Sequence, residues 1–241
     1  MNTVFILWQD KSHSGRMWHA VAKIIYDLSS GYILSYTKGA SNSRFHGFPN
    51  MVDKTQSYSS RELFSFLKNR IPPSSRPEHE ALYEWCNLET SANYLELLAA
   101  SGGEKATDSY RVISLPQNEN GSYLNTFFVS GIRYLDESQK LYISSLKAGH
   151  LIDYVFEDNN INDPLAVLLL DHVQKTNLGY YPRYLTDDLR NLNDLKANVQ
   201  IQVVKVNQDA PEQFRMLCKT TSSWPTDFKS CDNDEFRDYI D

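Results

Sequence analysis

The sequence predicts an α+β chain made of two modules, and three features of its pattern indicate this fold class. Short β-branched and aromatic runs alternate with turn residues along the chain, which is typical of antiparallel strands. Three of the four helical patterns fall between residues 59 and 100, in the first half. The polar segment 116–122 contains no large apolar residue and predicts a linker, with a domain boundary near residue 120.

The first module, residues 1–120, is expected to combine an antiparallel sheet with helices. Apolar and β-branched runs predict strands over residues 4–8, 20–26, 32–36 and 108–115. A Ser-Ser-Gly turn at 29–31 indicates a hairpin, and the Gly- and Ser-rich stretch 38–55 indicates a loop. Helices are predicted from a cap at Ser59 or Ser60 to just before Pro72, over about 78–86, and over about 92–100.

The second module, residues 121–241, consists mainly of short strands. They are predicted over residues 125–134, 151–156, 166–170, 179–181, 199–206 and 214–220. A helix is expected over about 186–195. Many short strands with one or two helices are typical of a small barrel or sandwich. The final residues, from Ser230 on, form an acidic tail that we expect to be loosely held.

Composition excludes several classes of protein. The longest apolar run covers residues 165–170, far short of the roughly 20 residues that cross a membrane. The N-terminus lacks the pattern of a secretory signal, and three widely spaced cysteines support no disulfide framework, so we expect a cytoplasmic protein with reduced thiols. The net charge of −6 disfavours a protein that coats duplex DNA, and any nucleic-acid contact should be small and local.

Catalytic and cofactor motifs do not emerge from the sequence. The stretch 158–163 alternates oxygen ligands as a calcium loop does, but Asp163 stands where the loop needs glycine. The Gly-rich stretch 101–105 follows a helix, whereas a phosphate-binding loop precedes one. Asp187 and Asp188 offer a carboxylate pair for a hydrolase, yet adjacent helical residues do not face one pocket. We therefore predict a non-enzymatic protein with no cofactor, no metal and no membrane association.

One group of residues in the second half suggests binding. A strand is expected to end in Arg133 and Tyr134, and Gly149 precedes the next strand. An Asn- and Asp-rich loop follows at 157–167, and a Gly-Tyr-Tyr-Pro-Arg segment lies at 179–183. By themselves, these residues also fit a polar turn, solvated arginines and core tyrosines.

The order of these four pieces resembles a HIRAN domain over about residues 125–206. The matching segments are 131–134 (Gly-x-Arg-Tyr), Gly149, 160–167 (Asn-x-x-Asp-x-x-Ala) and 179–183 (Gly-Tyr-x-x-Arg). The chain departs from animal members at Leu135, where they have a second tyrosine, and at Asn162, where they have an aromatic residue. The resemblance implies an OB-like small β-barrel that binds single-stranded DNA at a free 3′ end.

The resemblance also implies roles for individual side chains. Arg133 would contact a phosphate, and Tyr134 would stack on a base, which tolerates any sequence. Asn160 and Asp163, with Asn159 beside them, would face the terminal sugar and its hydroxyl. Tyr180 and Arg183 would close the pocket.

The first module is similar to the N-terminal subdomain of HipA-type toxin kinases. This similarity is carried by Trp8 and by the segments 32–36, 58–64, 69–72, 97–98 and 102–103. No catalytic loop or metal-binding motif of a kinase follows. The resemblance implies a bacterial-type adaptor whose first module docks a protein partner. The alternative function is an antitoxin-like regulatory subunit that binds a HipA-type kinase and no DNA.

Overall fold

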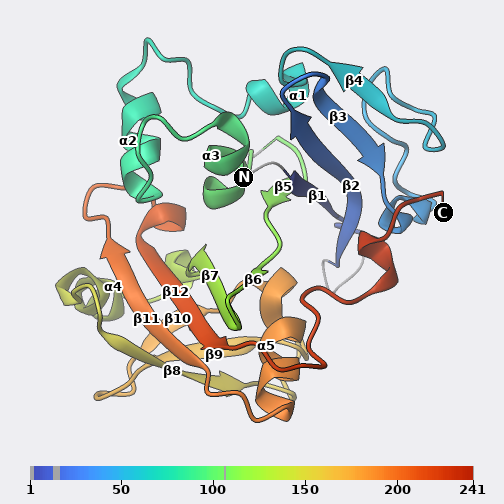
Figure 1. The fold of residues 1–241 in the computed structure, drawn as a ribbon. Helices are drawn as coiled ribbons and strands as arrows, with labels where there is room; N and C mark the ends of the chain where they lie inside the picture. Colours follow the sequence, from blue (N-terminus) through green and yellow to red (C-terminus); the bar gives the residue numbers. More distant parts are fainter. Residues whose placement is uncertain (1–2, 13–16, 106, 241) are drawn as a thin grey trace. The chain divides into compact units, whose positions relative to one another are not determined.

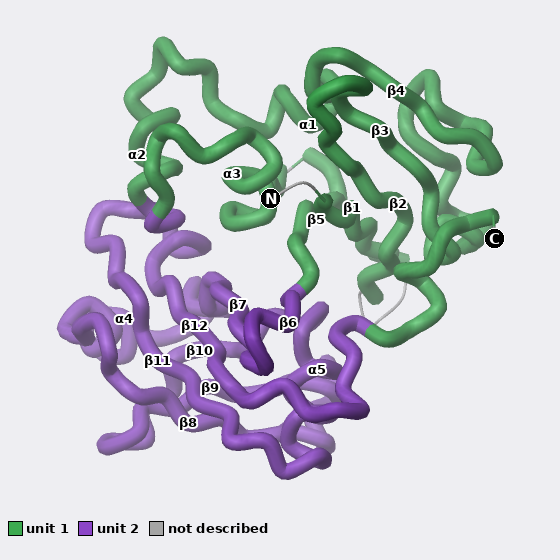
Figure 2. Tube along the Cα trace, viewed as in Figure 1, with its two compact units in different colours: residues 1–84, 88–115, 232–241 green, residues 85–87, 116–231 purple. Residues whose placement is uncertain are grey.

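The computed structural model of the chain describes residues 3–12, 17–105 and 107–240 (Figure 1). The described chain is α+β, with two antiparallel sheets in two compact units (Figure 2). Unit 1 comprises residues 1–84, 88–115 and 232–241, and unit 2 comprises residues 85–87 and 116–231. The division therefore falls at 115/116 rather than near 120, and the C-terminal tail belongs to unit 1 rather than to the second module.

Unit 1 is built on a five-stranded sheet with the order β4-β3-β2-β1-β5. The strands are β1 (Thr3–Gln9), β2 (Trp18–Asp27), β3 (Gly31–Tyr36), β4 (Tyr58–Ser60) and β5 (Tyr110–Ile113). The helices are α1 (Ser65–Lys68), α2 (Pro77–Trp85), whose last residue belongs to unit 2, and α3 (Tyr94–Ser101), and η1 (Lys38–Ser41) is a 3₁₀ turn. Central strand residues such as Val4, Ile6 and Ile24 are fully buried, as expected for the middle of a sheet.

The ends of α3 follow directly from its sequence. The Asn93 side chain accepts hydrogen bonds from the backbone N–H groups of Leu95 and Glu96, and Glu96 reaches back to the Asn93 N–H, which completes a capping box. Gly102 ends the helix in the left-handed conformation, at φ 76°.

The helix predicted from Ser59 or Ser60 begins later and is shorter than expected. Ser60 pairs with Tyr32 of β3, so these serines form an edge strand instead of a cap. The remaining helix is the four-residue α1, and Phe66 stacks on Phe48 with ring centroids 4.6 Å apart. Pairing with a distant strand overrides the local capping signal here.

The acidic tail is held by unit 1, contrary to the expectation of a loosely held segment. Backbone hydrogen bonds run from the Lys38 N–H to the Arg237 carbonyl (2.9 Å) and from the Tyr239 N–H to the Tyr36 carbonyl (3.1 Å). His19 and Lys23 on β2 pair with Glu235 and Asp238. These backbone hydrogen bonds and the pairing of tail carboxylates with His19 and Lys23 hold the tail on unit 1.

Unit 2 contains a seven-stranded sheet with the order β10-β9-β8-β11-β12-β7-β6. Its strands are β6 (Gln117–Glu119), β7 (Ser122–Phe128), β8 (Leu151–Phe156), β9 (Val167–Asp171), β10 (Asn177–Tyr180), β11 (Gln200–Val206) and β12 (Met216–Ser223). The helices are α4 (Glu137–Ser145) and α5 (Thr186–Asp194), with 3₁₀ turns η2 (Ile132–Tyr134), η3 (Arg183–Leu185) and η4 (Glu212–Phe214). The fifth 3₁₀ turn, η5 (Asp234–Phe236), lies in the tail.

The strand ladders of unit 2 do not form a closed barrel, which corrects the expected OB-like closure. One isolated bridge joins Ser130, after β7, to Tyr180 of β10, through two backbone hydrogen bonds of 2.9 and 2.8 Å. Gly179 makes this approach possible, because a Cβ atom there would lie 2.5 Å from the Ser130 carbonyl oxygen, and its φ is +116°. The bridge places the segment after β7 beside β10, the strand at the opposite end of the sheet order.

Two local predictions in unit 2 were wrong, and one helix was missed. The supposed linker 116–122 is a β-hairpin, because Asn120 and Gly121 both adopt positive φ (53° and 80°) and connect β6 to β7. The strand predicted over 125–134 ends at Phe128, and Arg133 and Tyr134 lie on the 3₁₀ turn η2. Helix α4 was not predicted, although Asp136 and Gln139 form a capping box at its start.

Candidate functional site

The candidate site lies where three segments of unit 2 meet: η2, the loop 157–166 between β8 and β9, and the chain from Tyr180 to Arg183. The Ser130–Tyr180 bridge fixes the first of these to the third. A Cβ atom on Gly131 would lie 3.3 Å from Cδ2 of Tyr180, so the glycine lies directly against the tyrosine ring. Gly131 also begins η2 at φ 82°, and Arg133 and Tyr134 therefore project from a turn packed against Tyr180.

Asn160 organises the loop 157–166. Its side-chain carbonyl oxygen accepts hydrogen bonds from the backbone N–H groups of Asn162 (2.9 Å) and Asp163 (3.2 Å). Its side-chain amide donates to Glu157 at 2.7 Å, and its backbone N–H donates to the Glu157 carbonyl at 2.9 Å. This is the use of asparagine in turns that the sequence suggested. The loop is consequently preorganised without a ligand.

Tyr180 connects the loop to η2. Its ring lies against Gly131, and its hydroxyl lies close enough to the Glu157 and Asn160 side chains for both to influence its pKa. Burial raises the pKa of Tyr180, and the negative charge of Glu157 raises it further. The hydroxyl is therefore neutral near pH 7 and able to donate a hydrogen bond.

Asp163 and Arg183 form an ion pair, with 3.0 Å between Arg183 Nε and Asp163 Oδ2. The second carboxylate oxygen of Asp163 accepts the Leu165 N–H at 3.0 Å. Arg183 also donates to the Thr186 hydroxyl at 2.9 Å. Both side chains stay about a quarter exposed, at 29% for Asp163 and 24% for Arg183. Each carboxylate oxygen keeps a lone pair, so Asp163 can still accept a ligand hydroxyl.

Arg133 and Tyr134 are the exposed part of the site. Tyr134 is 74% exposed, and the Arg133 guanidinium lies over its ring at 4.7 Å. Arg133 makes no ion pair with any residue that the structure describes. By contrast, Arg183 pairs with Asp163, and Arg190 pairs with Asp158 at 2.8 Å. Arg133 is therefore the cation at this site that remains available to an anionic ligand.

The structure thus brings Asn160, Asp163, Tyr180 and Arg183 into one connected group, with Arg133 and Tyr134 joined to it through Gly131. Asn159 is exposed on the same loop. Sequence reasoning missed two residues that shape the site. Glu157 accepts a hydrogen bond from the Asn160 amide, and its charge raises the pKa of Tyr180. Arg190 of α5 lies 4.4 Å over the Phe156 ring while it pairs with Asp158. An isolated carboxylate or arginine gives no pattern that would have revealed these contacts.

Other polar groups of unit 2 are structural. Asp188 is 2% exposed, and it accepts hydrogen bonds from the Cys231 N–H at 2.7 Å and from the Ser230 and Tyr123 hydroxyls. Burial raises its pKa to about 6, although these hydrogen bonds act in the opposite direction. Asp187 and Asp188 therefore do not form a carboxylate pair in one pocket. Asp171 is fully buried and holds His150.

The cysteines, the possible metal ligands and the helices of the described residues provide no further candidate site. The three cysteines are free and buried, and burial raises the pKa of the Cys86 thiol to about 12. Within the described ranges, no group of three His, Cys, Asp or Glu side chains could hold a metal ion. In the same ranges, no helix has the length and apolar character needed to cross a membrane.

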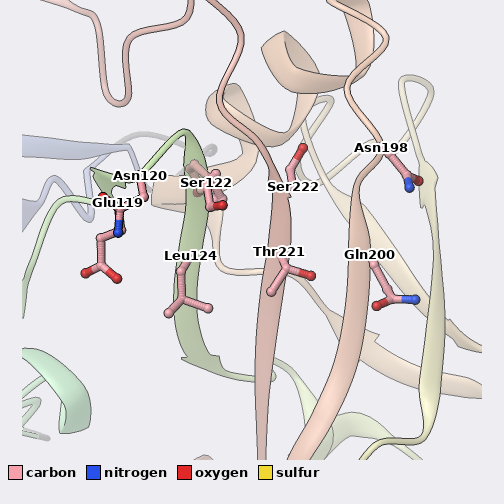
Figure 3. Close-up of a pocket in the computed structure, with 9 residues that line it drawn as sticks. Glu119, Asn120, Ser122, Leu124, Asn198, Gln200, Thr221 and Ser222 are labelled. Carbon is pink, nitrogen blue, oxygen red and sulfur yellow. The ribbon is translucent and has the colours of Figure 1, made fainter.

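A separate hollow lies on the outer face of the sheet (Figure 3). Leu124, Thr221 and Gln200 lie side by side there on β7, β12 and β11, in the register that pairs Thr221 with both others. Ser222 also lines this hollow, and its hydroxyl is buried without a hydrogen-bond partner in the described chain. None of the residues predicted from sequence contributes to it.

Comparison with protein-family models finds no match, and neither does comparison with curated proteins. Two solved structures are similar to part of the chain. A protein from Lactobacillus plantarum has 22% identity and a TM-score of 0.35, over 42% of this chain and 97% of that one. The HIRAN domain of human HLTF has 19% identity and a TM-score of 0.33, over 43% of this chain and 80% of that one.

Proposed function

We propose that the chain is a non-catalytic binding protein that recognises single-stranded DNA, or a DNA 3′ end, at the site formed by η2, the loop 157–166 and the segment from Tyr180 to Arg183. The observation that carries the proposal is the exposed pair of Arg133 and Tyr134 beside a preorganised polar group. An exposed tyrosine offers a stacking surface for any base, and the adjacent guanidinium offers a phosphate contact.

The charges of the site favour an end over the middle of a strand. Glu157, Asp158 and Asp163 lie on the loop of the site, and the cations Arg183 and Arg190 already pair with two of them. Carboxylates accept a hydrogen bond from a sugar hydroxyl but repel phosphate. A terminal 3′-hydroxyl therefore fits beside Asn160 and Asp163, whereas a 3′-phosphate does not.

The test is fluorescence anisotropy with a labelled single strand that ends in a 3′-hydroxyl and a second that ends in a 3′-phosphate. We expect the hydroxyl end to bind more tightly. Replacing both Arg133 and Tyr134 with alanine should weaken its binding by about 1–3 kcal/mol for the lost base stacking alone. The matched control replaces exposed Arg76 and Tyr94 of unit 1 with alanine, and it should bind as the wild type does. Equal binding by the two variants contradicts the proposed site.

A second candidate function is a regulator that binds a protein partner, of which a HipA-type kinase is the proposed example. The net charge of −6 favours it, because such a protein gains little from phosphate contacts. The polar hollow around Gln200 and Thr221, which Glu119 also lines, offers a surface of suitable chemistry for another protein. Absence of binding to both DNA probes, together with co-purification of a kinase core, would favour this candidate.

A further inference from the structure

Strand β8 has a neighbouring strand on both sides over only part of its length. On one side, β9 pairs with it as far as Phe156. On the other side, β11 pairs with only the first two residues of β8. The chain that leads into β11 turns back on itself there, since the Val199 N–H donates to the Ala197 carbonyl at 2.9 Å. Residues 153–156, which we call the open half of β8, therefore have a strand partner on one side only within the described chain.

The backbone groups of Tyr154 point to the open side. In an antiparallel ladder, the N–H and C=O of successive residues point to alternate sides of the strand. The Leu151 carbonyl accepts the His172 N–H at 3.3 Å, and just beyond β8 the Glu157 N–H donates to the Ala166 carbonyl at 3.0 Å. Odd-numbered residues thus face β9. The N–H and C=O of Tyr154 face the other way, where the ladder with β11 has ended.

A groove lies beside the open half of β8, and we call it the β8 groove. Tyr154 and Val155 line it on one side, and Asn198 and Val199 line it on the other. Val155 is 45% exposed, and its neighbour across the ladder is the half-buried Leu168 of β9. The groove therefore offers unpaired main-chain groups next to an exposed aliphatic side chain.

The open half of β8 lacks the features that usually protect an exposed strand edge. Such edges are very short, carry charged side chains or contain proline. The edge strand β6 of the same sheet fits this pattern, because it has three polar residues and ends in Glu119. In the open half of β8 there is no proline, and its one charged residue, Asp153, is already paired with Lys175 and His172. This edge can therefore accept another strand.

We propose that the β8 groove binds an extended segment of a partner protein, which adds a strand to the open half of β8. The added strand supplies main-chain partners to Tyr154 and places an apolar side chain against Val155. Nucleic acid has no matching series of N–H and C=O groups, and β6 of a second copy has no apolar side chain for Val155. The occupant is thus a peptide with aliphatic residues at alternate positions. This inference goes beyond the proposed DNA binding and does not depend on it.

The experiment measures the binding of a fluorescein-labelled peptide, Lys-Thr-Val-Thr-Val-Thr-Lys, by fluorescence anisotropy. A second peptide has the same sequence and charge, but its three central backbone nitrogens are methylated and cannot donate. The variant is Val155→Asp, and the matched control is Leu124→Asp, which changes a side chain that is 42% exposed on β7. Relative to wild type, Val155→Asp should lower the affinity by about tenfold, and Leu124→Asp should keep it within about twofold. The methylated peptide should not bind.

Amide hydrogen exchange, followed by NMR on the full chain, tests the main-chain contact itself. In the free protein, the Tyr154 N–H should exchange at least about tenfold faster than the Val155 N–H, which faces β9. The unmethylated peptide should slow the exchange of Tyr154 to a rate similar to that of Val155. Equal protection of the two amides in the free protein would mean that the edge is already covered, and it would overturn the proposal.

The remaining outcomes are equally decisive. No binding of the unmethylated peptide, or equal binding of the methylated one, contradicts strand addition. A loss with Leu124→Asp instead of Val155→Asp assigns the peptide to the hollow of Figure 3 and also overturns the proposal. Val155→Asp should bind the single strand with a 3′-hydroxyl as the wild type does, so failure of the peptide test leaves the DNA site untouched. Circular dichroism checks that both variants are folded.

Discussion

Replacement of Asp188 by asparagine should remove a pH dependence from the stability of unit 2. The pKa of Asp188 is about 6 in the folded protein, against 3.8 for an ordinary aspartate. A carboxyl group whose pKa is raised by folding binds its proton more tightly in the folded state. Its contribution is therefore most favourable below about pH 4 and is lost as the pH rises through 6. A difference of about two pKa units corresponds to roughly 3 kcal/mol.

Asparagine keeps the shape and the main contact of Asp188 without the charge. Its carbonyl oxygen can accept the Cys231 N–H, and its amide can donate to the Ser230 or Tyr123 hydroxyl. Urea denaturation of both proteins between pH 4 and 7, followed by the fluorescence of Trp224 and the other tryptophans, measures the difference in unfolding free energy. As the pH rises from 4 to 7, we expect the unfolding free energy of the variant to increase by about 2 kcal/mol relative to that of the wild type. A difference that is constant with pH would refute the assignment of a buried, destabilised carboxylate.

Two further predictions concern the bridge in unit 2 and the tail in unit 1. Gly179→Ala places a Cβ atom 2.5 Å from the Ser130 carbonyl oxygen and should lower stability by about 2 kcal/mol or more. The control is Gly121→Ala, at φ +80° with no other atom within 4 Å of the new Cβ, and it should lower stability by only about 1 kcal/mol. Equal losses of stability for the two variants in urea denaturation would contradict the role of the bridge. Glu235→Gln should lower the pKa of His19, which its hydrogen bond to Glu235 now raises. The stabilising effect of Glu235 should accordingly be present below about pH 6.5 and decline as the pH rises through the raised pKa of His19, which NMR titration of the imidazole measures.

Local sequence patterns predicted most strands and the helices α2, α3 and α5, because their signals are short-range. The runs at β1, β2 and β3 are rich in apolar, β-branched and aromatic residues, and Gly102 marks the end of α3. The Asn120-Gly121 turn carried an equally local hairpin signal, and it was misread as a linker because β6 is short and fully polar.

The features that sequence reasoning missed depend on residues far apart in the chain. Ser60 becomes an edge strand because Tyr32 pairs with it, and the tail is ordered because His19 and Lys23 face its carboxylates. At the candidate site, the sequence indicated the polar loop and the tyrosines. It did not reveal that Arg183 neutralises Asp163, which leaves Arg133 as the available cation. Pairing of this kind appears only when the fold brings the side chains together.

The most direct test of the proposed DNA site is an NMR titration of the protein with a short single strand that ends in a 3′-hydroxyl. The account predicts that amide shifts concentrate at residues 131–134, 157–166 and 177–186. Shifts concentrated at residues 119–124 and 198–200, around the hollow of Figure 3, or in unit 1, would contradict it.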